Sequence, residues 1–172
     1  MNELNHIQSA PLFQAESVET HLASHRALAK EMYRICMPIL TCSEIDYITY
    51  TKHYDDRMIH YSTETAEQTQ FKLNHLKYQP LSTNIEKTSI MSWQQHSNQQ
   101  FLGEFIRVTQ LNNGLLMLYK YPEYSESISI ATRSHSLQLL FNYLNQPDTL
   151  INLSCYIKEA CRRHQKKIDQ RT

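Results

Sequence analysis

The chain has 172 residues, the size of a single domain with one substantial hydrophobic core. Its 17 basic residues balance its 17 acidic residues, so the composition indicates neither a polybasic nucleic-acid-binding protein nor a disordered chain. It has two glycines, Gly103 and Gly114, which excludes the glycine-rich phosphate loops on which most nucleotide-dependent enzymes depend.

The first predicted element is a helix that follows a polar leader over residues 1–16. Ser17 can cap this helix, and apolar residues recur at three- and four-residue intervals as far as Cys36. Pro38 is expected to end it, because a proline inside a helix removes a backbone donor.

A β-hairpin is predicted next. Segment 45–54 is rich in Ile, Tyr and Thr, and segment 57–63 follows the pair Asp55-Asp56. A two-residue turn at that pair would set two cross-strand pairs, His53 with Met58 and His60 with Thr51. We interpret both histidines as surface residues, with a shared site on one face of the hairpin as the alternative.

The middle of the chain predicts a helix, a short strand and a helical turn. Segment 65–76 is built largely of Ala, Glu, Gln, Lys and Leu, and it suits a partly exposed helix. After Pro80, a loop leads to a strand over 88–93 and to a polar helical turn over 97–102.

An Asn-Gly pair provides the clearest local signal. Segments 105–109 and 115–121 flank Asn112-Asn113-Gly114, and Asn and Gly favour the positive φ angles of a tight hairpin turn. Segment 115–121 is apolar on both faces, which is typical of a central strand covered on both sides. A further strand, 127–132, alternates isoleucines with small residues.

Two helices are predicted at the C-terminal end, over 135–144 and 148–168, and Asp148 is suited to be the N-cap of the second. Their apolar residues recur at helical spacing: Leu137, Leu140, Phe141 and Leu144 in the first, and Leu150, Leu153, Ile157, Ala160, Cys161 and His164 in the second. We interpret the second stripe as core packing. If the opposite side, with Ile151 and Tyr156, is also apolar, it would suit a dimer interface.

This order of elements predicts the fold class. Helices before and after the strands can cover both faces of one sheet. We therefore expect an α+β fold, an α-β-α sandwich around a five-stranded antiparallel sheet, similar to PAS and GAF domains. Residues 17–168 would form this single domain, between a flexible leader, residues 1–16, and a tail, residues 169–172.

The cysteines and the apolar runs predict a reducing, cytoplasmic environment. The four cysteines match neither a zinc knuckle nor a redox pair, and we expect buried reduced thiols at Cys36, Cys42, Cys155 and Cys161. The N-terminal residues lack the apolar stretch of a secretory signal. The longest apolar run, 115–119, is far shorter than a membrane span, so no membrane contact is expected.

The stretch 105–164 carries a series of motifs in a characteristic order: F-I-R-V, N-N-G-L-L-M-L-Y-K-Y, E-Y-S-E-S-I-S-I-A-T, L-F-N-Y-L-N and L-I-N-L-S-C-Y-I-K-E-A. In order and character it resembles the second half of the ligand-sensing domain of LuxR-type bacterial regulators. The resemblance implies a small molecule, often an acyl-homoserine lactone, bound between the sheet and one helical layer. It also implies dimerisation, and a C-terminal helix-turn-helix that presents itself to DNA.

Two features depart from this family pattern. The window 62–82 keeps Phe71 and Tyr78 but lacks the Trp and the Asp-Pro step of the family's aromatic helix, so the set of residues that anchors a lactone is incomplete. Trp93 does stand where the family often has a Trp in the pocket wall. The chain ends at Thr172, where the family's DNA-binding module would begin, so no direct contact with nucleic acid is expected.

Aromatic residues on or beside the predicted strands are the candidates for a ligand site. A tyrosine ring can pack on a sheet while its hydroxyl group binds a buried ligand. The predicted ligand-binding residues are Tyr47, Tyr61, Phe71 and Trp93, and core packing is the alternative for each. No spacing resembles a catalytic motif, so we do not expect an enzyme.

Two further groups of residues are candidate sites. His21 and His25 lie four residues apart and could bind a metal together, but without a third ligand we predict no metal site and no cofactor. The basic residues Arg162, Arg163, Lys166, Lys167 and Arg171 could contact phosphate or an acidic partner. We interpret them as a solvated helix end that complements the helix dipole.

The sequence thus predicts a small-molecule-sensing module of LuxR type that acts without its own DNA-binding head and holds a small apolar ligand. The alternative is a ligand-independent interaction module that forms a heterodimer with a full-length regulator. Homodimerisation is compatible with both hypotheses.

Overall fold

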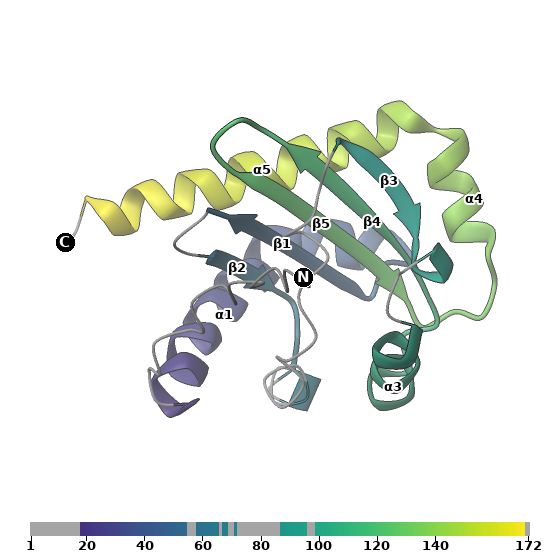
Figure 1. Ribbon diagram of the computed structural model, residues 1–172, viewed down its shortest axis with the longest axis horizontal. Helices are drawn as coiled ribbons and strands as arrows, with labels where there is room; N and C mark the ends of the chain where they lie inside the picture. The colour runs from purple at the N-terminus through teal and green to yellow at the C-terminus, as the bar shows by residue number, and fades with distance from the viewer. Residues whose placement is uncertain are drawn as a thin grey trace, which may run out of the picture.

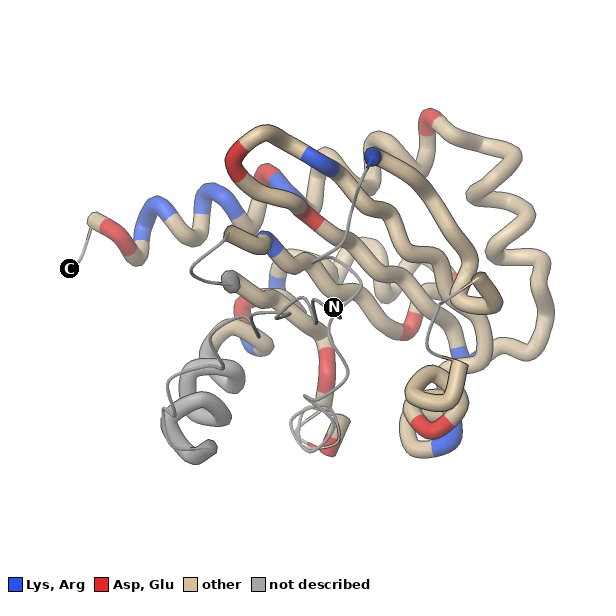
Figure 2. Tube along the Cα trace, viewed as in Figure 1, with Lys and Arg blue, Asp and Glu red and all other residues tan. Residues whose placement is uncertain are grey.

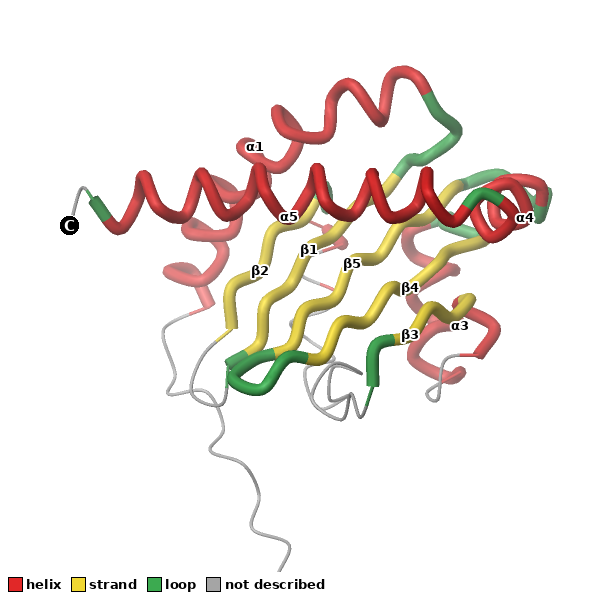
Figure 3. Tube along the Cα trace, turned by 90° about the horizontal axis from the view of Figure 1, so that it is seen from above, coloured by secondary structure: helices red, strands yellow, loops and turns green. Residues whose placement is uncertain are grey.

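The computed structural model describes residues 18–54, 58–65, 67–68, 71, 87–95 and 99–170, with the backbone alone for 18–27 and 58. The elements in chain order are α1 (Val18–Cys42), β1 (Tyr47–His53), β2 (Met58–Ser62), β3 (Ser89–Ser92), the short helix η2 (Trp93–Gln95), α3 (Gln99–Thr109), β4 (Asn113–Lys120), β5 (Ser125–Thr132), α4 (Gln138–Asn145) and α5 (Pro147–Asp169). The five strands form one antiparallel sheet in the order β2-β1-β5-β4-β3. Helices cover both faces of this sheet (Figures 1 and 3), which confirms the predicted sandwich.

The two faces of the sheet carry different side chains, because successive residues of a strand point to opposite sides. The face covered by α1, α4 and α5, here the α5 face, holds the larger core. Its buried members include Met32, Cys36, Ile48, Tyr50, Leu115, Met117, Ile128, Ile130, Leu140, Leu150 and Ile157. The opposite face, here the α3 face, holds a second cluster of Tyr47, Trp93, Leu102, Phe105, Leu111 and Ala131.

The predicted hairpin register is confirmed. In the β1–β2 ladder Thr51 lies opposite His60 and His53 lies opposite Met58. The hydroxyl group of Thr51 is 2.8 Å from Nδ1 of His60. The turn residues 55–57 lie outside the described residues.

Helix α1 does not end at Pro38 as expected. Pro38 supplies no amide donor to the carbonyl of Arg34, but the turn that follows, with residues 39 and 40, packs against the core of the α5 face. The hydroxyl group of Tyr156 donates a 2.8 Å hydrogen bond to the neighbouring carbonyl of Ile35. Tertiary contacts therefore carry the helix past its proline.

The prediction of a hairpin turn at Asn112-Asn113-Gly114 is also wrong. Residues 105–109 belong to α3, because Leu102, Phe105 and Thr109 recur at helical spacing and are buried together. Asn113 and Gly114 begin β4, and Gly114 does not have a positive φ angle. The turn that joins β4 to β5 lies at residues 121–124, where the amide of Tyr121 donates to the carbonyl of Tyr124 at 3.0 Å.

The C-terminal helices differ in detail from the prediction. Helix α5 begins at Pro147 with Gln146 as its N-cap, so Asp148 lies in the first turn instead. The inward side of α4 is Leu139 and Leu140, which are 6% and 4% exposed. Leu137, Phe141 and Leu144 of the predicted stripe are exposed instead, because the short helix packs on the sheet by its other side. The stripe on α5 is confirmed, with Leu150, Ile157 and Cys161 buried.

The cysteines divide into two classes, all with free thiols. Cys36 and Cys161 are buried, as expected, and both thiol groups lie within 4 Å of the sulfur of Met32, at 3.8 and 3.9 Å. Cys42 and Cys155 are exposed, contrary to the prediction, because they lie on the outer sides of α1 and α5. In the described part of the chain, no helix combines the length and the apolar character needed to cross a membrane.

Acid is expected to destabilise the fold through His53. Burial lowers the pKa of His53 from 6.5 to about 4. Since the unfolded chain binds this proton at a higher pH than the folded chain does, stability should fall as the pH drops from about 6.5 to about 4. His53→Gln should reduce that loss by about 1 kcal/mol, a figure discounted for partial solvent exposure.

The measurement is urea unfolding at about pH 7 and at about pH 4.5. His135→Gln, at an exposed position on the loop before α4, is the matched control. An equal loss of stability in all three proteins would contradict the role of His53.

Candidate functional site

The floor of the candidate site is the α3 face of the central strands, which is lined by small hydroxyl side chains. On β5 the register places Ser125, Ser127 and Ser129 on this face, while Ile128 and Ile130 point to the opposite core. On β1 the same face carries Thr49 and Thr51, which are buried. Hydroxyl groups therefore occupy the part of this face formed by β1 and β5, where a core would ordinarily place branched apolar residues, while β4 places Leu116 and the buried Leu118 beside them.

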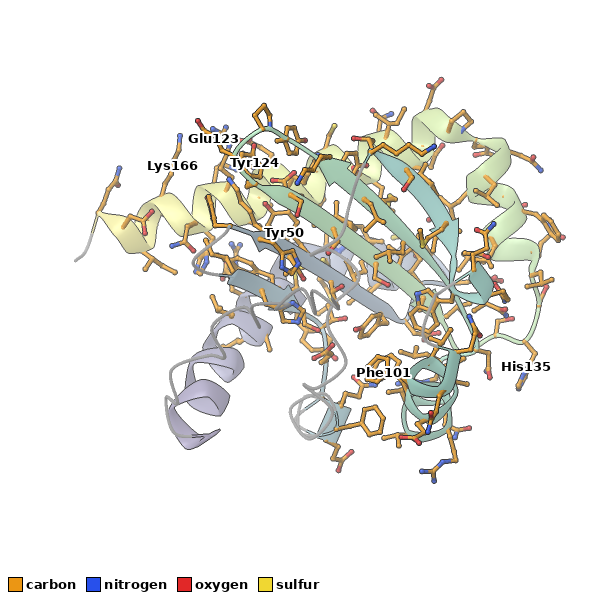
Figure 4. The ribbon with its side chains drawn as sticks, viewed as in Figure 1. Tyr50, Phe101, Glu123, Tyr124, His135 and Lys166 are labelled. Carbon is orange, nitrogen blue, oxygen red and sulfur yellow. The ribbon has the colours of Figure 1, made fainter. Side chains whose placement is uncertain are left out.

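An aromatic wall stands beside this floor. The ring centroids of Tyr47, Trp93 and Phe105 are 6.0 to 6.3 Å apart, with edge-to-face geometry. Phe101 stacks on Phe105 at 6.1 Å, and Phe71 lies 6.0 Å from both. Figure 4 shows Phe101 on α3, beside the sheet. These five rings come from four separate segments, so the tertiary fold alone assembles them.

Trp93 is held in one orientation by its neighbours. Its indole Nε1 donates a hydrogen bond to the hydroxyl of Ser129 at 3.2 Å. Gly114 lies against the face of the indole, and a Cβ atom at this position would be 2.3 Å from Cε2 of Trp93. Glycine is therefore required here by the close approach of a side chain and not by a turn.

A buried carboxylate completes the polar part of the site. The hydroxyl of Tyr47 donates a 2.7 Å hydrogen bond to Oε1 of Glu64, and these residues are 3% and 4% exposed. Burial, together with the negative charge of Glu64, raises the pKa of Tyr47 well above its ordinary value. The backbone amide of Glu64 donates to the hydroxyl of Ser62 at 3.0 Å. Tyr47 therefore remains protonated and acts as a hydrogen-bond donor.

The structure brings together three of the four residues predicted for the ligand site. Tyr47, Phe71 and Trp93 share the cluster on the α3 face. Tyr61 does not join them, because it lies in the core of the α5 face, where its hydroxyl is 2.9 Å from Nδ1 of His164. The hairpin places alternate residues on opposite faces, so Tyr61 and Tyr47 are separated by the sheet.

Sequence reasoning missed several residues of this site. Ser129 could have been found, because the alternation of 127–132 puts its small residues on the face opposite the isoleucines. Phe105 was predicted in a strand, and the structure places it on α3, where it belongs to the cluster on the α3 face. Glu64 carries no local signal, since only the tertiary fold sets it against Tyr47.

The helix expected over 65–76 lies mostly outside the described residues, which show helical backbone at 67–68 and 71. The side chains of the predicted metal pair His21 and His25 also lie outside them. Within the described part of the chain, no group of three or more His, Cys, Asp or Glu side chains could hold a metal ion. The arrangement offers aromatic surface, hydroxyl groups and one buried carboxylate, which are the elements of a recognition site.

No protein-family model and no curated protein sequence matches the chain. Among solved structures, Escherichia coli SdiA is 19% identical with a TM-score of 0.59, over 84% of this chain and 66% of SdiA. A structure described as SdiA in complex with octanoyl-rac-glycerol is 15% identical with a TM-score of 0.48, over 69% and 54%. The VqsR ligand-binding domain of Pseudomonas aeruginosa is 12% identical with a TM-score of 0.49, over 85% and 98%.

The chain thus spans 66% of the length of E. coli SdiA. SdiA is a LuxR-type regulator, and the structural match extends over 84% of this chain. The resemblance inferred from residues 105–164 is therefore confirmed at the level of the fold. The chain has the α+β fold of the autoinducer-binding domain of LuxR-type regulators.

Proposed function

We propose that the chain is a small-molecule-sensing module that binds an apolar ligand with a polar head on the α3 face of its sheet. The observation that carries this proposal is the floor of small hydroxyl side chains beside a wall of five aromatic rings. It occurs in a fold shared with a ligand-responsive class of regulators. The proteins that the chain resembles are regulators and not enzymes, which supports binding as the function.

The chemistry of the floor supports a ligand with both polar and apolar parts. Serine side chains leave volume that isoleucine would fill, and their hydroxyl groups can bind an ester, amide or alcohol. The rings of Trp93 and Phe105 supply apolar surface for a chain or a ring. The hydrogen bond from Tyr47 to Glu64 fixes the orientation of the Tyr47 ring, which is part of this surface.

Filling the floor with a larger side chain is expected to weaken ligand binding strongly. Octanoyl-glycerol is a suitable probe, because it carries an acyl chain and free hydroxyls. Ser129→Leu should weaken its binding at least tenfold, since the larger side chain occupies the ligand volume and removes the acceptor for Trp93. Fluorescence of Trp93, the single tryptophan of the chain, measures the affinity.

Thr149→Leu, at an exposed position in the first turn of α5, introduces the same side chain away from the site and serves as control. Native mass spectrometry of protein purified from cells adds an independent test, in which a retained small molecule supports the proposal. Absence of any bound species, together with equal or no binding of octanoyl-glycerol by wild type and both variants, would refute it.

Exposed apolar residues on the last two helices support a second candidate function, an interaction module. Phe141 and Leu144 of α4 are 54% and 48% exposed, and Ile151 and Tyr156 of α5 are 53% and 43% exposed. Such residues are typical of surfaces that pair with another chain. Pull-down from native cytosol tests this function. Recovery of a related regulator supports it, and a strictly monomeric chain that recovers chaperones alone contradicts it.

A further inference from the structure

A pocket lies on the α5 face, on the opposite side of the sheet from the candidate site. It has a volume of about 520 Å³ and lies between the C-terminal half of α5 and the ends of β1, β2 and β5. Small-molecule pockets commonly have roughly 300–1,000 Å³. We call it the tyrosine groove, because Tyr50, Tyr54, Tyr61, Tyr121 and Tyr124 line it.

The groove arises from a change of residue type along the α5 face. One row of the sheet aligns Tyr50, Ile128 and Met117, which belong to the core. The next row outward aligns Lys52, Glu126 and Tyr119, and tyrosines at positions 54, 121 and 124 follow beyond it. The hydroxyl groups of Tyr50 and Tyr61 are hydrogen-bonded to Glu126 and His164. The tyrosines therefore continue the core as an aromatic surface whose polar tips are satisfied within the protein.

Most charges in the groove are already paired. Nζ of Lys158 lies 3.2 Å from Oε2 of Glu126, and the hydroxyl of Tyr50 donates to the other oxygen at 2.8 Å. Arg162 pairs with Glu159 at 2.6 Å. These pairs neutralise the centre of the groove.

Two lysines at its rim differ, since no ion pair joins Lys52 or Lys166 to a carboxylate among the described residues. The ammonium group of Lys52 lies over the rings of Tyr124 and Tyr54, at 3.7 and 5.0 Å from their centroids. Figure 2 shows the basic residues along the C-terminal half of α5, and Figure 4 shows Lys166 there, with Tyr124 at the neighbouring end of the sheet. The groove is lined by four basic and three acidic side chains. Its aromatic floor therefore has a net positive charge of one, with two ammonium groups at the rim that form no direct ion pair within the described part of the chain.

We propose that the tyrosine groove is a second small-molecule site, which takes an organic anion with an aromatic or flat apolar body. The carboxylate or phosphate of such a ligand would bind Lys52 and Lys166, and its body would stack on Tyr121 and Tyr124, whose rings lie 4.6 Å apart. This site is separate from the one proposed on the α3 face, and neither depends on the other.

Naphthylacetate and its neutral amide naphthylacetamide are matched probes for this site. NMR titration of protein labelled at its tyrosine rings should show naphthylacetate shifting the signals of Tyr50, Tyr121 and Tyr124. The amide should bind about tenfold more weakly, because it lacks the charge. Lys52→Gln should weaken binding of the anion by a similar factor. Lys120 is an exposed residue that the register places on the α3 face at the same end of the sheet. The control substitution Lys120→Gln should therefore leave the affinity for the anion unchanged.

The proposal fails if naphthylacetate does not bind, if the amide binds equally well, or if Lys52→Gln binds like Lys120→Gln. It also fails if the shifts fall on Tyr47, on the opposite face. Mapping on the wild-type protein remains decisive should Lys52→Gln not fold. Binding of octanoyl-glycerol should be the same in Lys52→Gln and wild type, so failure of this proposal is distinguishable from failure of the sensor proposal.

Discussion

Gly114→Ala is expected to destabilise the protein by about 2–3 kcal/mol, the upper part of the range typical of overpacking in a filled core. The added methyl group would lie 2.3 to 2.6 Å from three atoms of the Trp93 indole, so the ring must move. Moving it breaks the hydrogen bond to Ser129 and disturbs the ring contacts with Tyr47 and Phe105. Urea unfolding followed by far-ultraviolet circular dichroism measures the effect.

The other glycine is the matched control. A Cβ atom at Gly103, in the interior of α3, would meet nothing within 4 Å. Gly103→Ala should therefore stabilise the helix by about 0.5–1 kcal/mol, since glycine is a poor helix former. Combining Gly114→Ala with Trp93→Ala should remove most of the cost of the alanine, because the clash has a single partner. Equal effects of the two glycine substitutions would contradict this account.

Lys158→Met is expected to destabilise the protein by about 2–3 kcal/mol. Its ammonium group pairs with Glu126, whose side chain is 9% exposed, and donates to the hydroxyl of Tyr121 at 3.1 Å. Burial acts to lower the pKa of Lys158, but the bond to Tyr121 and the charge of Glu126 outweigh it and raise the pKa. Removing one partner of such a pair leaves the other charge buried and poorly compensated.

The second substitution Glu126→Gln tests this explanation. In Lys158→Met with Glu126→Gln, no unpaired charge remains and the amide oxygen can still accept from Tyr50, so most of the stability should return. Thermal unfolding of the two single variants and the double variant measures the coupling between the sites. Strictly additive losses would show that the pair contributes nothing beyond the packing of its two side chains.

Local patterns were sufficient for much of the sheet. The alternation of Ile128 and Ile130 with serines predicted which side of β5 enters the core, because strand side chains have a period of two. The two-residue spacing of the hairpin predicted the pairing of Thr51 with His60, which the ladder confirms. The stripe on α5 likewise predicted Leu150 and Ile157 as buried. In each case one short-range periodicity decides the outcome.

Local patterns failed where contacts with residues distant in the sequence determine the secondary structure. Residues 105–109 favour a strand by composition, yet burial of Phe105 against Trp93 and Tyr47 holds them in a helix. Gly114 follows an asparagine, as in a hairpin turn, yet it is in a strand because an indole lies on it. Pro38 should end a helix, yet packing of the next turn continues it.

By itself the sequence determined the α+β class, a single antiparallel sheet between helices and the likeness to LuxR-type sensing domains, because these follow from periodicity and from the order of segments along the chain. Only the tertiary structure decided which aromatic residues share a face. The sheet separates Tyr61 from Tyr47, and the packing of the chain sets Phe105 and Glu64 against Tyr47. It also revealed the tyrosine groove, whose lining comes from strands and a helix far apart in sequence. The physical reason is that a binding site depends on contacts between segments, and the free energy of those contacts is not encoded in any one of them.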